Sequence, residues 1–277
     1  MVTLLDGAII IAAGIAAGII NVVAGAGTLI TFPVLLGLGI PPVIANVSNT
    51  VGLVPASISG AYGYRRELRG QWPSVIRMAT LSGAGALAGG AALLLLPADN
   101  FSVIVPFLLL IAAILAAIQP RVAAFVRRRS ADEAVHATRP LTFGLVLGVF
   151  LTGIYGGYFG AAQGVVLLAL LGILWSTDLN RANGAKNVLA GVANVISAVL
   201  FIAMGIVNWQ IAVLIGVGSA VGGRRSAVGS ALGLAVSCQR RPCVRFSLWL
   251  PWWPPLFYSS RDQRKTRRYR VLESSSL

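Results

Sequence analysis

Long apolar segments separated by short polar ones dominate this 277-residue chain. A membrane-spanning helix needs about 20 mostly apolar residues, at about 1.5 Å of rise per residue. Segments of this kind are predicted at 4–24, 43–64, 74–96, 101–118 and 182–206, and another begins near Trp209. The pattern predicts an all-α fold, a polytopic bundle of membrane helices.

Glycines interrupt two of the apolar runs. Gly25 and Gly27 end the first run, and a short apolar piece follows over residues 29–40. Gly160 and Gly164 end the run over residues 141–159, and a second short piece follows over 165–174. Neither short piece is long enough to cross about 30 Å of hydrocarbon alone. We therefore expect discontinuous helices at both places.

An internal repeat is predicted when the two halves are aligned without gaps so that Asn46 falls on Asn183 and Trp72 falls on Trp209. We call this alignment the repeat register. It also pairs Ala45 with Ala182, Val51 with Val188, Ala56 with Ala193, Ala61 with Ala198, Ser82 with Ser219 and Gly85 with Gly222. Two halves with matching interrupted helices are typical of secondary transporters. The predicted parts are a first transmembrane repeat (1–118), a cytoplasmic basic linker (119–140) and an incomplete second repeat (141–223).

Arginine placement predicts a topology. The arginines of 65–77 and of 121–139 are separated by two predicted spans, so both groups can lie in the cytoplasm. In the repeat register, Arg65, Arg66 and Arg69 fall on Ile202, Ala203 and Ile206, which carry no charge. We therefore expect the two halves to be inverted, with the N-terminus outside.

The last fifth of the chain departs from this pattern. Eleven of the 22 Lys and Arg residues and two of the eight acidic residues lie in 224–277, which contains several Pro and Trp residues. A basic extension on the membrane surface is one interpretation. We favour a change of reading frame near Gly223, after which the packing is expected to be poor. Because the excess charge lies in this tail, we do not expect nucleic-acid binding.

The interrupted helices are the candidate substrate site. Backbone groups freed at membrane depth persist only where protein or a wet cavity satisfies them, and a helix N-terminus favours an anion. Polar residues inside a span are usually functional. The candidate substrate-binding residues are Asn21, Gly25, Gly27, Thr28, Asn46, Ser48, Asn49, Thr50, Gly160, Gln163, Gly164, Asn183, Lys186 and Asn187. In the alternative interpretation, the glycines only permit tight helix packing and Lys186 extends to the membrane interface.

Catalytic motifs are missing from the sequence. It contains no P-loop, no metal-ligand cluster and no Ser/His/Asp set. The only histidine, His136, lies in the predicted linker, and Cys238 and Cys243 are interpreted as incidental thiols of the tail. We expect a protein that is not an enzyme and that needs no cofactor or metal.

Two segments carry a family resemblance: GIINVVAGAGTLITFPVL at 18–35 and GIYGGYFGAAQG at 153–164, together with the Ala-Asn pairs at 45 and 182. Over about residues 4–223 the chain resembles the sulfite exporter TauE/SafE family of bacterial membrane transporters. The resemblance implies two related halves with about eight helices, and a small, often sulfur-containing anion such as sulfite or an organosulfonate as the substrate.

Our leading hypothesis is a secondary transporter or exporter of small anions, multi-pass in the bacterial inner membrane. Its expected partners are the anion, a coupling proton or ion, and the lipid bilayer. A passive anion channel and a structural membrane protein without transport are the two alternatives. Substrate, direction, coupling ion and oligomeric state are left open by the sequence.

Overall fold

The computed structural model describes residues 3–132, 140–176 and 178–231, and these residues form helices joined by turns. In chain order the helices are α1 (Leu4–Ala24), α2 (Thr28–Gly37), α3 (Pro42–Gly63), α4 (Trp72–Leu95), α5 (Ala98–Asp132), α6 (Phe143–Tyr158), α7 (Gln163–Leu174), α8 (Leu179–Ala203) and α9 (Trp209–Ala231). The predicted all-α fold is thereby confirmed.

Local sequence signals set several helix starts. The Thr3 hydroxyl accepts a hydrogen bond from the Asp6 N–H, and the Asp6 carboxylate accepts one from the Thr3 N–H, which together form a capping box for α1. Pro42 begins α3, and its missing N–H costs no hydrogen bond because the first N–H groups of a helix have no intrahelical partner. The Asp178 carboxylate caps α8 by accepting from the Asn180 N–H at 2.8 Å.

Two helices extend beyond their predicted ends. We expected a span to end at Ile118, but α5 continues to Asp132, because the alanines and arginines that follow are good helix formers. Pro120 lies inside this helix, as proline does in membrane helices more often than in soluble ones. Likewise α9 continues past Gly223 to Ala231. The predicted repeat, linker and tail boundaries stay predictions, and His136, Cys238, Cys243 and residues 232–277 lie outside the described residues.

Four helical segments in the described part of the chain are long and apolar enough to cross a membrane. They are Leu4–Ala24, Trp72–Leu95, Val103–Arg128 and Leu179–Ala203. Shorter apolar helices occur at Thr28–Gly37, Phe143–Tyr158 and Gln163–Leu174, which include both predicted short pieces. A chain with such helices is suited to a bilayer.

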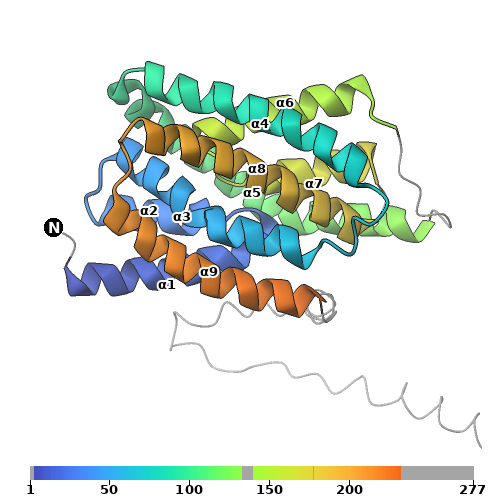
Figure 1. The fold of residues 1–277 in the computed structure, drawn as a ribbon, viewed down its shortest axis with the longest axis horizontal. Helices are drawn as coiled ribbons and strands as arrows, with labels where there is room; N and C mark the ends of the chain where they lie inside the picture. Colours follow the sequence, from blue (N-terminus) through green and yellow to red (C-terminus); the bar gives the residue numbers. More distant parts are fainter. Residues whose placement is uncertain (1–2, 133–139, 177, 232–277) are drawn as a thin grey trace, which may run out of the picture. The chain divides into compact units, whose positions relative to one another are not determined.

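Glycines allow two pairs of helices to pack closely. α1 lies along α9, and α4 lies along α6 (Figure 1). A β-carbon on Gly18 of α1 would lie 2.8 Å from the Cα of Ser219 on α9, and one on Gly153 of α6 would lie 3.1 Å from the Cα of Ser82 on α4. Backbones approach so closely only where side chains are small, which is how membrane helices associate.

α3 and α8 pack against each other. α9 packs on α3, and α4 packs on α8. On another side of α3, the short helix α2 packs beside α1. The buried ring of Phe32 on α2 meets that of Phe159, just after α6, edge to face at 5.1 Å between centroids. This contact places the start of α2 close to the end of α6.

Candidate functional site

The predicted site glycines lie at two short connections between helices. We call residues 25–27, between α1 and α2, the first junction, and residues 159–164, which lead from the end of α6 into the first turn of α7, the second junction. Gly25 has a φ of 72°, and Gly160 has a φ of 71°, a backbone conformation that suits glycine. Each left-handed glycine ends the helix before it, as in a helix C-cap.

The two junctions touch through their backbones. The Gly164 N–H in the first turn of α7 donates to the Gly25 carbonyl oxygen at 3.2 Å. A β-carbon on Gly164 would lie 2.5 Å from the Gly25 Cα, so side chains larger than hydrogen do not fit at this contact. The predicted anion donor at Gly164 is therefore engaged by protein in this conformation.

The side chain of Lys186, on α8, contacts the C-terminal end of α1. Its Nζ donates to the carbonyl oxygens of Val22 at 3.2 Å and Val23 at 3.1 Å. Asn187 Nδ2 also donates to the Val22 carbonyl, at 3.3 Å. The last carbonyls of a helix have no intrahelical partner and carry partial negative charge, which favours a cation there. Lys186 and Asn187 on α8 thus satisfy the end of α1.

The Lys186 side chain is fully buried, at 0% exposure. Among the acidic residues whose side chains the structure describes, Asp6 bonds with Thr3, Glu67 is exposed, and Asp178 caps α8 about 12 Å along that helix. A buried ammonium needs compensation for lost hydration. The contacts described for Nζ are two carbonyl oxygens, whereas an ammonium has three N–H donors.

The second junction has neutral partners. Asn46 Nδ2 on α3 donates to the Tyr158 carbonyl oxygen at the end of α6, at 3.0 Å. Gln163 Nε2 donates back to the Thr152 carbonyl at 3.3 Å, and the Tyr155 hydroxyl donates to the Ala161 carbonyl at 2.6 Å. Asn46 is 1% exposed, and its Oδ1 has no hydrogen-bond partner within the described part of the chain.

Thr28 and Asn49 join α2 to α3. Asn49 Nδ2 donates to the Thr28 hydroxyl at 3.1 Å, and the Thr31 hydroxyl donates to Asn49 Oδ1. All three side chains are buried. This network satisfies its own polar atoms, so it fixes the start of α2 against α3.

Three other predicted site residues lie away from the junctions. The Ser48 hydroxyl accepts from the Asn208 N–H, just before α9, at 3.0 Å. The Thr50 hydroxyl donates to the Asn46 carbonyl one turn earlier on its own helix. Asn183 Nδ2 donates to the Tyr64 hydroxyl at 3.0 Å, after the end of α3.

Sequence reasoning missed two members of a polar cluster beside Lys186, namely Ser57 and Asn194. Asn21 Nδ2 on α1 and Asn194 Nδ2 on α8 both donate to the Ser57 hydroxyl of α3, at 3.3 and 3.1 Å. A β-carbon on Gly60, one turn after Ser57, would lie 3.2 Å from the Asn187 amide carbon, so the cluster adjoins the Lys186 contacts. The repeat register also pairs Ser57 with Asn194, and that pairing was the available signal.

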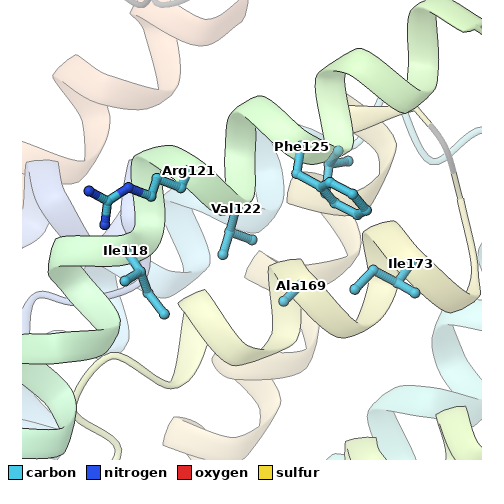
Figure 2. Close-up of a pocket in the computed structure, with 7 residues that line it drawn as sticks. Ile118, Arg121, Val122, Phe125, Ala169 and Ile173 are labelled. Carbon is cyan, nitrogen blue, oxygen red and sulfur yellow. The ribbon is translucent and has the colours of Figure 1, made fainter.

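An apolar crevice between α5 and α7 does not include the predicted site. It has a volume of about 300 Å³ and is lined by Ile118, Arg121, Val122, Phe125, Val126, Ala169 and Ile173. Figure 2 shows Val122 and Phe125 on the side of α5 that faces Ala169 and Ile173 on α7, whereas the Arg121 guanidinium points away from them. Polar ligand groups have no partner inside such a crevice.

A family model for the sulfite exporter TauE/SafE matches residues 10–239. The chain belongs to this family. The TauE/SafE match includes both junctions and both polar helices α3 and α8, and it extends beyond Gly223, where we expected the tail to begin.

Curated relatives of this TauE/SafE chain carry transporter names. A probable membrane transporter protein ORF9 of Sinorhizobium sp. is 30% identical over 82% of this chain and 83% of its own length. A probable membrane transporter protein of Haemophilus influenzae is 27% identical over 78% and 81%. The probable membrane transporter protein YfcA of Escherichia coli K12 is 27% identical over 75% and 74%. No solved structure matches the chain. With its apolar helices, the chain is a membrane protein of a transporter family.

Proposed function

We propose that this chain is a multi-pass secondary transporter or exporter of small oxyanions, of the sulfite or organosulfonate type, in the bacterial inner membrane. The observation that carries the proposal is Lys186. Its ammonium is fully buried at the first junction and bonds with two backbone carbonyls. An anion that binds there supplies the countercharge that the surrounding side chains do not.

The neighbouring polar groups suit an oxyanion. Asn21 and Asn194 bring amide donors close to the Lys186 contacts, and Asn187 lies beside Lys186 on α8. The Ser57 hydroxyl accepts from both amides and itself donates to the Leu53 carbonyl. Sulfite and sulfonates present several acceptor oxygens, which hydrogen-bond best to such donors and to an ammonium. The sulfur-containing substrate class follows from the family, whose model is described as a sulfite exporter.

The proposal treats α1–α2 and α6–α7 as two interrupted spans of an inverted repeat. Two hydrogen bonds support it. The Ser82 hydroxyl donates to the Leu189 carbonyl at 3.2 Å, and the Ser219 hydroxyl donates to the Gly52 carbonyl at 2.6 Å. The repeat register pairs the two donors with each other and the two acceptors with each other. Repeat-related interrupted helices around a central site are a common transporter architecture.

The contact between the junctions favours a gated transporter over an open channel. Gly25 and Gly164 meet without room for a β-carbon, so the backbone closes this point in the described conformation. Movement of one half relative to the other would separate them, which is how alternating access operates.

Flux in liposomes tests the proposal. The full chain is reconstituted, and uptake of labelled sulfite and of taurine is followed with and without an imposed ion gradient. We expect saturable, gradient-dependent flux that Lys186→Gln reduces at least about tenfold, since hydrogen bonds to charged groups contribute about 1.5–3 kcal/mol.

Arg77→Gln is the control for that experiment, because it removes one exposed cation at the start of α4 without touching either junction. Its flux is expected to equal that of the native chain. Flux no greater than that of empty vesicles, or equal flux with Lys186→Gln, rejects the proposal, and flux that never saturates assigns a passive channel instead.

A further inference from the structure

A second cavity lies between α3 and α8, on a side of Ser57 that the junctions do not occupy. Its volume is about 520 Å³, and it is lined by Ser57, Ile58, Ala61, Tyr62, Arg65, Trp72, Val188, Gly191, Val192, Val195 and Ile196. We call it the α3–α8 groove. Apart from Ser57, its lining residues take no part in the proposed transport of a small anion.

The groove walls are apolar and face outward. Ile58 is 57% exposed, Tyr62 is 64% exposed and Val195 is 36% exposed. These residues lie on helices of a membrane protein, where side chains that are exposed in the middle of a helix meet hydrocarbon. Along α3 the groove extends from Ser57 to the end of the helix at Gly63, about 9 Å of helix rise, and Arg65 follows in the next turn. A length of acyl chain fits such a surface.

At one end of the groove, the Arg65 guanidinium is held in place by Tyr62. The Arg65 guanidinium lies 3.7 Å from the centre of the Tyr62 ring, and its Nη1 donates to the Tyr62 carbonyl at 2.9 Å. A guanidinium has five donors, so this contact leaves several for a phosphate. Arg66 and Arg69 are exposed in the same turn, and Trp72 lines the groove beside them. Tryptophan and arginine are typical of the level of lipid headgroups.

We propose that the α3–α8 groove binds an anionic phospholipid, with an acyl chain along the groove and the phosphate on Arg65. A basic site between membrane helices recognises acidic headgroups in this way. The inner end of the acyl chain lies against Ser57, a residue that the protein itself leaves only 3% exposed.

Two other occupants fit the groove less well. A small hydrated oxyanion such as sulfite has no apolar body with which to cover walls of aliphatic side chains. A second copy of the chain would bring the same groove against itself, as two-fold contacts do. No acidic side chain lines the groove in the described residues, and the exposed Glu67 lies outside the lining, so the groove of a second copy brings no countercharge onto Arg65.

The test is native mass spectrometry of the full chain in detergent, titrated with phosphatidylglycerol and with phosphatidylcholine of the same acyl chains. We expect phosphatidylglycerol to bind about fivefold more tightly, the effect of one cation near an anionic headgroup. Arg65→Gln is expected to abolish that preference. Arg77→Gln, which removes a cation from outside the groove, should retain it.

A second variant separates the acyl chain from the headgroup. Ala61→Leu narrows the groove from its open side and is expected to weaken both lipids while leaving the preference intact. Equal binding of the two lipids by the native chain overturns the proposal, as does a preference that Arg65→Gln leaves unchanged. A dimer interface is tested by disulfide crosslinking of a Val195→Cys chain, made in a Cys238→Ser/Cys243→Ser background. If two copies crosslink and the crosslink displaces the lipid, the groove is a dimer interface instead.

Discussion

The first and second junctions have similar backbones and different side-chain partners. At both, a glycine with φ near 70° ends a helix, and a residue from the other half of the chain satisfies the exposed carbonyls. At the end of α1 that residue is the cation Lys186, aided by Asn187. At the end of α6 it is the neutral amide of Asn46. The difference shows that two junctions with similar backbones can be satisfied by a cation at one and by a neutral amide at the other, and that the cation lies where helix carbonyls favour positive charge.

A further contrast follows from the repeat register, which aligns Lys186 with Asn49. Asn49 bonds with Thr28 and Thr31 of its own half, whereas Lys186 reaches the end of α1 in the other half. Asn49 is satisfied by hydroxyl groups, but the Lys186 charge has no carboxylate partner among its described contacts. We therefore propose a structural role for Asn49 and a substrate role for Lys186.

The largest effect is expected from a substitution that breaks the contact between the two junctions. Gly25→Ala puts a β-carbon against Gly164 and also forces alanine into a left-handed conformation, so we expect a loss of about 2–5 kcal/mol of unfolding free energy. Gly160→Ala has the same strain, but its β-carbon meets its own helix at Gly156, and the expected loss is only about 1–2 kcal/mol. Denaturant unfolding in mixed micelles measures both. Equal losses for the two variants would show that the junctions do not depend on each other.

The second effect separates binding from folding at Lys186. At a sulfite concentration of about 100 times Kd, the native chain should gain about 2.7 kcal/mol of stability. Lys186→Met should gain none, because the ligand has lost its countercharge. Thermal unfolding with and without sulfite measures the gain, and Arg77→Gln is the matched loss of one positive charge. A full gain in Lys186→Met contradicts the assignment.

The third effect tests the neutral junction. Asn46→Ala leaves the Tyr158 carbonyl without its amide partner, and interhelical hydrogen bonds in membranes contribute about 0.6–1.7 kcal/mol. We expect that loss of stability together with an unchanged gain from sulfite, in the same thermal unfolding experiment. Loss of the gain would mean that the second junction also holds the anion.

The smallest effect sharpens the comparison of the halves. Ser82→Ala and Ser219→Ala each remove one hydroxyl that donates to a carbonyl of the other half. We expect losses of about 0.6 kcal/mol each, and additive losses in the double variant, because the two sites share no partner. Unfolding of the two single variants and of the double variant measures this, and clearly unequal losses would count against equivalent positions in a repeat.

Much of the fold could be predicted from the hydrophobic pattern, because a membrane requires long apolar helices and glycine marks where they stop. The end of α5 could not, since an arginine-rich stretch resembles a loop although arginine is a good helix former. The candidate site was predicted in part. Lys186 is conspicuous as a cation near an apolar helix, but its contact with Val22, far earlier in the chain, depends on tertiary packing.

Ser57 and Asn194 are residues that could not be selected from the sequence. Each lies about two turns after the polar run at the start of its helix, and no local pattern distinguishes a binding residue from a helix-packing one. Only their pairing in the repeat register connects them. Ser48 and Asn183 are both polar residues near helix starts, and their described partners, the Asn208 N–H and the Tyr64 hydroxyl, lie outside the junctions.

The most direct measurement is an experimental structure of the full chain with selenite, a heavier analogue of sulfite whose selenium can be located by anomalous scattering. The account predicts a selenium position beside Lys186, with an oxyanion oxygen about 3 Å from Nζ, at hydrogen-bonding distance. A saturated complex in which Lys186 still bonds only with the Val22 and Val23 carbonyls, and the selenium lies elsewhere, would contradict it.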